Sequence, residues 1–237
     1  MRGLVIEFNG FKGAIAFLRA IRKNNNKEWF EAHRSEYEKV ILNPSRAFAV
    51  EMGEHLMALE PTIDFEPKIN KALFRIFRDT RRMGANKAPL KSRIGIIFTQ
   101  GSSGGRLQKS SFYLHFSPDE LFVSVGVRWF EKPMLDAYRE YIKDDKRRVA
   151  LDRLLKLLEA KGYKTIEKEY KRYPRGFSAE MSSVELSLYK GMATYKILEP
   201  NLIEEGDRLI DTLYKIYEDM LPLQRIVYEI SLRAKED

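Results

Sequence analysis

The chain of 237 residues has no cysteine, and this absence excludes disulfide bonds, thiolate nucleophiles and thiolate metal ligands. It has only three histidines, and no group of residues has the spacing of a zinc site, so no transition metal is predicted. No apolar run approaches the roughly 18 residues that a membrane span needs, and the apolar part of the first residues is too short for a secretory signal. We therefore expect a cytoplasmic protein that does not cross a membrane.

The sequence also lacks the common signatures of nucleotide binding and acyl transfer. The glycine-rich stretch GSSGGRL, which starts at Gly101, lacks the terminal Gly-Lys-Ser/Thr of a phosphate-binding loop. It resembles the nucleophile elbow G-x-S-x-G only superficially, because its glycine spacing is different. A flexible hairpin turn is the better interpretation of these glycines. The sequence assigns no cofactor.

The positive charge of the chain is concentrated in one segment, residues 68–93, which we call the basic window. Nine of its 26 residues are basic and only Asp79 is acidic, so it carries the whole formal net charge of +8. A general compositional bias would spread the excess along the chain. Leu, Phe and Ile are interspersed among the charged residues of the window. We therefore expect the window to be a folded surface that faces an anion and not a solvated tail.

Hydrophobic periodicity predicts helices in the first quarter and the last third of the chain. The first helix starts at Phe11 and ends at Asn24-Asn25-Asn26, the second runs from Lys27 to a break at Asn43-Pro44, and the third runs from Ser45 to Pro61. After Lys132-Pro133, two further helices are expected through residues 135–142 and 149–158. A strongly amphipathic helix through residues 203–220 is expected to kink or stop at Pro222, before a closing helix through residues 226–230.

The middle of the chain changes to the pattern of strands. Residues 93–99, 112–117 and 120–129 are rich in β-branched and aromatic side chains and read as antiparallel strands, and residues 163–173 read as another strand. No segment is long enough to act as a linker. We therefore expect one α+β domain over residues 1–237, with an antiparallel sheet in the middle of the chain flanked by N-terminal and C-terminal helices.

Residues 68–79 of the basic window fit two patterns. As a helix, they align Lys68, Lys71, Arg75 and Arg78 in one basic stripe, continued by Arg82. As a strand, they mix apolar and charged residues on both faces, but the Phe and Ile content and the neighbouring strands favour it. The strand is the preferred interpretation, and the helix stays open.

Either pattern brings arginines close enough to hold one anion. Guanidinium groups suit bidentate capture of phosphate or carboxylate, and we predict that Arg75, Arg78 and Arg81 provide them. Lys87 and Lys91 follow in an expected loop that could close over the ligand. Asp79 is expected to pair with a neighbouring arginine, and catalysis by this carboxylate is the less favoured alternative.

Other side chains complete the set of candidates. His115, in the strand-like FYLHF, is the best general acid or base by residue type, although a lone strand histidine needs a partner before it indicates catalysis. Aromatic residues such as Trp129 could stack on a ligand, although at strand spacing they are more often core.

Several segments together carry a family resemblance. They are NNNKEWFEAHRSEYEKVILNP, ALFRIFRDTR, KAPLK, FYLHFSPDE, YPRGF and PLQRIV. In this order they resemble an uncharacterised family, domain of unknown function 2461, over nearly the whole chain. The resemblance implies a single full-length domain and supplies no activity, ligand or catalytic residue. Arg175, in YPRGF, joins the predicted anion-binding group from a distant segment.

The chain departs from the family pattern at two places. The family usually has a short polar turn leading to K-x-P-Y-K, whereas this chain has a longer loop through residues 82–86 to Lys87-Ala88-Pro89-Leu90-Lys91. The family often has Asp-His-Pro where residues 181–183 read Met-Ser-Ser. Chemistry that depended on either segment would be altered here, whereas an anion site built from arginines and lysines would survive.

Three functions fit these patterns. The favoured one is a pocket lined by arginine and lysine that binds a small molecule carrying phosphate or carboxylate, with His115 or Asp79 as the proton carrier if the protein is an enzyme. The second is a nucleic-acid-binding module that uses the same charges in an open groove. The third is a structural or assembly protein with an internal Arg/Asp network. The sequence does not fix the oligomeric state.

Overall fold

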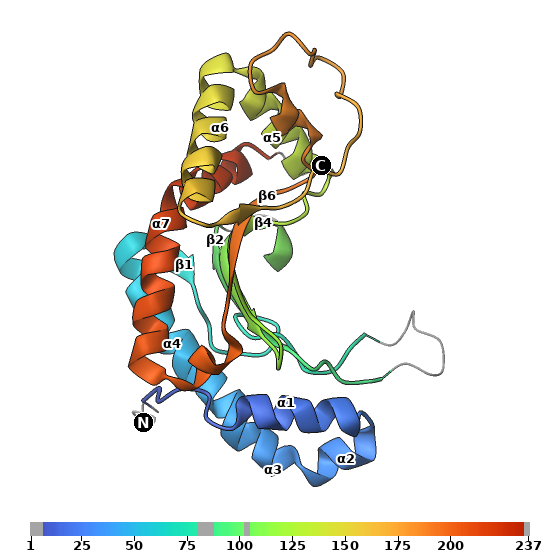
Figure 1. Ribbon diagram of the computed structural model, residues 1–237, viewed down its shortest axis with the longest axis vertical. Coiled ribbons are helices and arrows are strands. Elements are labelled where there is room, and N and C mark those ends of the chain that lie inside the picture. Colours follow the sequence, from blue (N-terminus) through green and yellow to red (C-terminus); the bar gives the residue numbers. More distant parts are fainter. Residues whose placement is uncertain (1–6, 80–87, 102–104, 235–237) are drawn as a thin grey trace. The chain divides into compact units, whose positions relative to one another are not determined.

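The computed structural model describes residues 7–79, 88–101 and 105–234 (Figure 1). Its regular elements, in chain order, are α1 Ala14–Lys23, α2 Lys27–Ala32, α3 Arg34–Tyr37, η1 Glu38–Leu42, α4 Asn43–Leu59, β1 Ile63–Asp64, β2 Ile94–Gln100, η2 Arg106–Gln108, β3 Ser110–Phe116, β4 Leu121–Val127, α5 Lys132–Lys143, α6 Asp145–Ala160, β5 Lys164–Thr165, η3 Val184–Leu188, β6 Met192–Leu198, η4 Pro200–Glu204 and α7 Gly206–Arg233. The predicted α+β class is confirmed. Within the described ranges, no helix combines the length and the hydropathy that crossing a membrane would require.

The first helices begin close to where the apolar spacing predicts them, but the single second helix predicted from Lys27 is divided at His33 into α2 and α3. In α1, Ile15, Leu18 and Ile21 are buried on one face. The helix ends at Asn24, and the side chain of Asn26 caps α2 by accepting a hydrogen bond of 2.8 Å from the backbone N–H of Trp29. The asparagine run thus closes one helix and opens the next.

The predicted helix break at Asn43-Pro44 is wrong. A π-helical turn, η1, follows α3 directly, and α4 begins at Asn43 without an intervening loop. Pro44 lies in the first turn of α4, where its missing N–H costs little because the first N–H groups of an α-helix have no partner within the helix. The chain therefore stays helical through a proline that the first turn of α4 accommodates.

The six strands form one antiparallel sheet in the order β1-β2-β3-β4-β6-β5. Strands β2, β3 and β4 match the predicted strands, whereas β6 comes from a segment for which the sequence indicated no strand. The long strand expected at residues 163–173 is wrong, since only Lys164 and Thr165 pair with β6. The rest of that segment has no regular ladder in the described structure.

Pro222 does not stop the C-terminal helix. Helix α7 continues through it from Gly206 to Arg233. A proline inside a helix costs roughly 3 kcal/mol. Completely buried side chains lie on both sides of it, including Met220 and Leu223, and each contributes on the order of 2 kcal/mol by leaving water. The apolar stripe therefore outweighs the proline.

The chain folds into two compact units and passes between them five times. The first unit comprises Met1–Phe98, Tyr113–Val123 and Ile197–Lys215, and the second comprises Thr99–Phe112, Ser124–Lys196 and Ile216–Asp237. The core of the first contains the contacting rings of Phe8, Phe11 and Phe48. The core of the second contains Phe130 against Tyr138. The single full-length domain stays a prediction.

Residues 68–79 of the basic window contain no helix, so the helical alternative is wrong: a turn at residues 68–72, in which Asn70 has φ +69°, leads into a non-helical segment at residues 73–79. Their pairing is limited to isolated bridges, among them Leu73 with Ile96 and Phe77 with Leu90. The first half hydrogen-bonds to β2, and the second half hydrogen-bonds to residues 88–91, where the N–H of Arg78 donates to the carbonyl of Pro89 at 2.8 Å. The described residues of the window thus contain no continuous strand, and its residues 76–78 pair with its residues 89–91.

Candidate functional site

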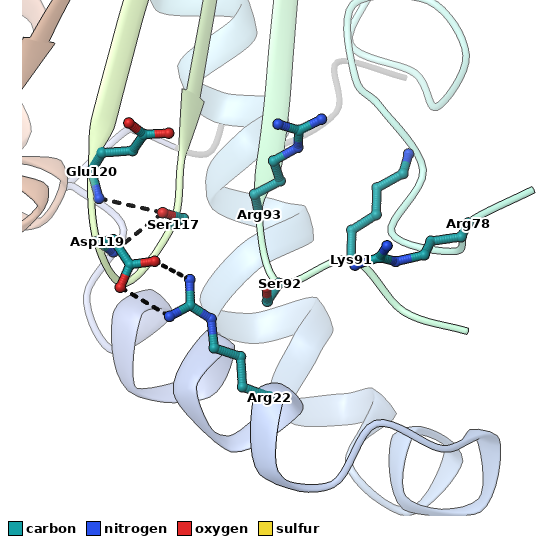
Figure 2. Close-up of a pocket in the computed structure, with 8 residues that line it drawn as sticks. All are labelled: Arg22, Arg78, Lys91, Ser92, Arg93, Ser117, Asp119 and Glu120. Atoms are coloured by element: carbon teal, nitrogen blue, oxygen red, sulfur yellow. Dashed lines mark hydrogen bonds and ion pairs between the residues drawn. The ribbon is translucent and has the colours of Figure 1, made fainter. Parts of the chain in front are cut away.

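The first unit contains a pocket at the place where the basic window meets the sheet. Its volume is about 370 Å³. It is lined by Arg22, Arg78, Lys91, Ser92, Arg93, Ser117, Asp119 and Glu120 (Figure 2). Four of these side chains are cationic and two are carboxylates. Helix α1, the basic window, the segment entering β2, and the β3–β4 turn each contribute to the lining.

The β3–β4 turn fixes the position of the two acids. The N–H of Ser117 donates to the carbonyl of Glu120 at 2.9 Å and so closes the turn. The hydroxyl oxygen of Ser117 accepts hydrogen bonds from the N–H groups of Asp119 and Glu120 at 3.2 and 3.3 Å. Such side-chain bonds to the backbone two and three residues later are typical of serine in tight turns. The hydroxyl therefore holds the backbone from which both carboxylates project.

Asp119 forms a two-point ion pair with Arg22 of α1. Arg22 Nη1 donates to Asp119 Oδ1 at 2.9 Å, and Nη2 contacts Oδ2. The hydrogen bond raises the pKa of Arg22 and lowers the pKa of Asp119. Because both side chains are more than a third exposed, the pair adds little to stability. Within the pocket, the charges of Arg22 and Asp119 therefore compensate each other.

Glu120 is joined to His115 of β3. Oε1 of Glu120 lies 3.1 Å from Nε2 of His115, whose side chain is almost completely buried. The His115 ring stacks on Phe122 with a centroid distance of 4.8 Å. Glu120 lines the pocket, whereas His115 is not among the lining residues. The predicted acid or base therefore orients a carboxylate, and that carboxylate is the group that a ligand would meet.

Backbone hydrogen bonds hold two of the cations. Arg78 Nε donates to the carbonyl of Leu90 at 3.0 Å, and Lys91 Nζ donates to the carbonyl of Arg75 at 2.9 Å. The Nη groups of Arg78 remain available to a ligand, because the bond to Leu90 uses Nε only. Within residues 7–79, 88–101 and 105–234, neither Arg78 nor Arg93 pairs with a carboxylate. The positive charge of both guanidinium groups is therefore uncompensated by the described acids.

Asn25 clamps the main chain next to these cations. Its Nδ2 donates to the carbonyl of Leu90 at 3.0 Å, and its Oδ1 accepts from the N–H of Leu90 at 2.8 Å. Leu90 is completely buried, and its carbonyl also accepts from Arg78. The Asn25 side chain therefore pairs with a peptide group much as a neighbouring strand would, and it secures the segment that carries Lys91.

We expect Asn25→Ala to reduce the free energy of unfolding by about 1–2 kcal/mol, because it leaves a buried N–H without its acceptor and removes one of the donors to Leu90 O. Asn24→Ala is the matched control. The side chain of Asn24 is exposed and bonds only to the carbonyl of Ala20, so its loss should cost about 0.5 kcal/mol. Urea denaturation measures both values, and equal losses would show that the clamp does not stabilise the protein.

The structure brings together only some of the predicted anion-binding residues. Arg78 and Lys91 line the pocket. Arg75 is not among the lining residues and lies 3.7 Å from Asp79, so Asp79 has the ion-pair role that the sequence favoured. Arg81 and Lys87 lie outside the described residues.

Two predicted residues belong to the second unit. Arg175 is exposed there, and its convergence with the arginines of the basic window stays a prediction. Trp129 is 54% exposed, and the Nζ of Lys190 lies 3.8 Å from the centroid of its ring. Its contact is thus with a cation of its own unit.

Sequence reasoning did not select the remaining lining residues, Arg22, Ser92, Arg93, Ser117, Asp119 and Glu120. Arg93 closes the basic window but was not chosen as a site residue. The three residues of the β3–β4 turn lie within or next to the FYLHFSPDE segment, which was the available signal. For Arg22, the sequence offers no indication of a role in the pocket except its position shortly before the asparagine run.

The described residues contain no group of three or more histidines and acids that could hold a metal ion. Among family models, the one described as "Conserved hypothetical protein (DUF2461)" matches residues 13–225. A comparison with curated proteins finds no match.

Proposed function

We propose that this chain, which belongs to the DUF2461 family of conserved hypothetical proteins, binds a small molecule carrying a phosphate or carboxylate group in the pocket of its first unit. The observation that carries the proposal is the charge balance of the lining. Arg22 is paired with Asp119, but Arg78 and Arg93 pair with no described carboxylate. Cations gathered around a pocket attract an anion, and guanidinium forks bind phosphate or carboxylate through two hydrogen bonds.

The positioning of the cations supports the same function. Arg78 and Lys91 each donate one hydrogen bond to a backbone carbonyl, and Asn25 secures the Leu90 peptide between them. Side chains that are already oriented lose less conformational entropy when a ligand arrives. The pocket is therefore partly organised for binding before the anion enters.

The size of the pocket favours a small molecule over a nucleic acid. A volume of about 370 Å³ lies within the range of pockets for small ligands. A polynucleotide would instead need cations spaced along an open groove, with affinity falling steeply as salt rises. Binding is the proposal, and no reaction is assigned.

The test is the binding of inorganic phosphate, followed by NMR or calorimetry at low ionic strength. We expect wild type to bind phosphate, and Arg78→Gln and Arg93→Gln each to weaken binding by roughly 10- to 150-fold, since a hydrogen bond to a charged group contributes about 1.5–3 kcal/mol. Arg153→Gln is the matched control, because Arg153 is an exposed arginine of α6 in the second unit. Thermal denaturation verifies that each variant is folded.

Either of two kinds of result would overturn the proposal. In the first kind, the pocket does not bind the anion: neither phosphate nor acetate binds to wild type, or the two pocket variants bind phosphate as well as Arg153→Gln does. The other is that a single-stranded oligonucleotide binds far more tightly than phosphate, with a steep dependence on salt that Arg78→Gln reduces. The second outcome would assign the basic surface to nucleic acid.

A further inference from the structure

The anion pocket also presents an acid to its ligand. Glu120 lines the same pocket as Arg78 and Arg93, yet no ion pair within 4.0 Å joins it to either arginine among the described residues. In Figure 2, the side chains of Glu120 and Arg93 extend in the same general direction, and Lys91 and Arg78 lie beyond Arg93. One pocket thus has a cationic side and an acidic side that do not neutralise each other directly.

The position of Glu120 is fixed by its own contacts. Its N–H and carbonyl are both bonded within the β3–β4 turn. Its Oε1 bonds to His115, which is buried and stacked on Phe122. Among the described residues, only one of the two carboxylate oxygens has a partner, and the side chain is 37% exposed. The second oxygen is therefore free to accept a hydrogen bond from a ligand.

Glu120 would weaken the binding of a plain anion. A carboxylate near a bound phosphate raises the energy of the complex by like-charge repulsion. Asp119 does not have this effect, because Arg22 neutralises it through two contacts. A site for phosphate alone would gain affinity if Glu120 were replaced by a neutral residue. A ligand with an ammonium group at its other end turns the same carboxylate into an attractive contact, so the pocket would bind such a ligand more tightly than a simple anion.

We propose that the ligand is a small zwitterion, with a phosphate or carboxylate bound by Arg78 and Arg93 and an ammonium group bound by Glu120. This inference rests on the proposed function, since it requires the anion to occupy the arginine side. Amino acids and aminoalkyl phosphates share the required chemistry. In this arrangement His115 is a positioning residue, which holds the carboxylate from behind and does not touch the ligand.

The test compares two probes of similar size, phosphoethanolamine and ethyl phosphate, which share a phosphate monoester and differ in the ammonium group. We expect wild type to bind phosphoethanolamine about fivefold more tightly than ethyl phosphate, because one partly exposed ion pair contributes an effect of this size. Glu120→Gln should remove this preference and bind ethyl phosphate at least as tightly as wild type does. Glu54→Gln is the matched control, because Glu54 is an exposed acid of α4, and it should retain the wild-type preference.

The outcomes separate this inference from the proposed function. If wild type binds both probes but does not prefer phosphoethanolamine, or if Glu120→Gln keeps the preference, the zwitterion inference is wrong and anion binding stands. If neither probe binds to wild type, the proposed function fails as well. If Glu120→Gln does not fold, the comparison of the two probes on wild type still tests the preference for a zwitterion, and Glu120→Asp, which keeps the charge, tests the role of Glu120 by a smaller preference.

Discussion

Gly126→Ala is expected to reduce the free energy of unfolding by about 3 kcal/mol or more, through two effects at one position. Gly126 of β4 has φ +112°, a conformation that side-chain-bearing residues rarely adopt. A Cβ there would lie 2.2 Å from the carbonyl oxygen of Met192 in the adjacent strand β6. Because the obstacle is backbone, relief requires the two strands to separate.

Two other glycines of the second unit separate the cost of the backbone conformation from the cost of the close contact. Gly162, at the end of α6, has φ +85° and open space around its Cβ position, so Gly162→Ala should cost about 1–2 kcal/mol from conformation alone. Gly105 has an ordinary φ of −66° and the same open space, so Gly105→Ala should change stability by less than about 0.5 kcal/mol. Urea denaturation gives all three values. If Gly126→Ala costs no more than Gly162→Ala, the contact with Met192 does not constrain the sheet.

Arg148→Met is expected to reduce the free energy of unfolding by about 3 kcal/mol, although methionine fills much of the same volume. Arg148 is 1% exposed. It donates to the carbonyls of Ile142 and Lys143 at 2.9 and 3.2 Å, and to the carbonyl of Ser182 at 2.6 Å. Ile142 and Lys143 end α5, where the last carbonyls have no acceptor role within the helix. Methionine would leave all three oxygens without this donor.

Arg147 is the matched control for Arg148. It precedes Arg148 in α6, but its side chain is 41% exposed, lies over the ring of Tyr141 and reaches Glu229 only at 3.9 Å. Arg147→Met should cost less than about 1 kcal/mol, as for other exposed ion pairs. Chemical denaturation of the two variants measures the difference. Equal losses would mean that Arg148 stabilises the unit by its apolar stem and not by its hydrogen bonds.

The helices and central strands follow from local periodicity, and the errors occur where tertiary packing outweighs it. Pro222 should stop a helix on its own, but Met220 and Leu223 are buried on either side and keep α7 continuous. Strand β6 was not predicted because its first three residues, from Met192 to Thr194, are all buried and show no alternation. A strand covered on both faces cannot be distinguished by period from other apolar runs.

Only part of the candidate site could be predicted from the sequence, because the rest of it also depends on tertiary packing. Charge concentration identifies the basic window, and two of its selected cations, Arg78 and Lys91, line the pocket. The acids and Arg22 are contributed by other elements, and Arg22 is 97 residues distant in sequence from its partner Asp119. Such a pairing depends on how the elements assemble, which no local pattern encodes. The sequence therefore predicts that the site is positively charged, but it does not predict which residues line it.

The clamp at Leu90 has a consequence for natural variation. Among the described residues, the Asn25 side chain bonds only to the N–H and carbonyl of Leu90, and these groups are the same in every amino acid except proline. The clamp is therefore indifferent to side-chain identity, provided that the side chain fits its buried surroundings. A residue other than proline that fits the same buried space at position 90 should therefore keep both hydrogen bonds to Asn25 and leave Lys91 in place.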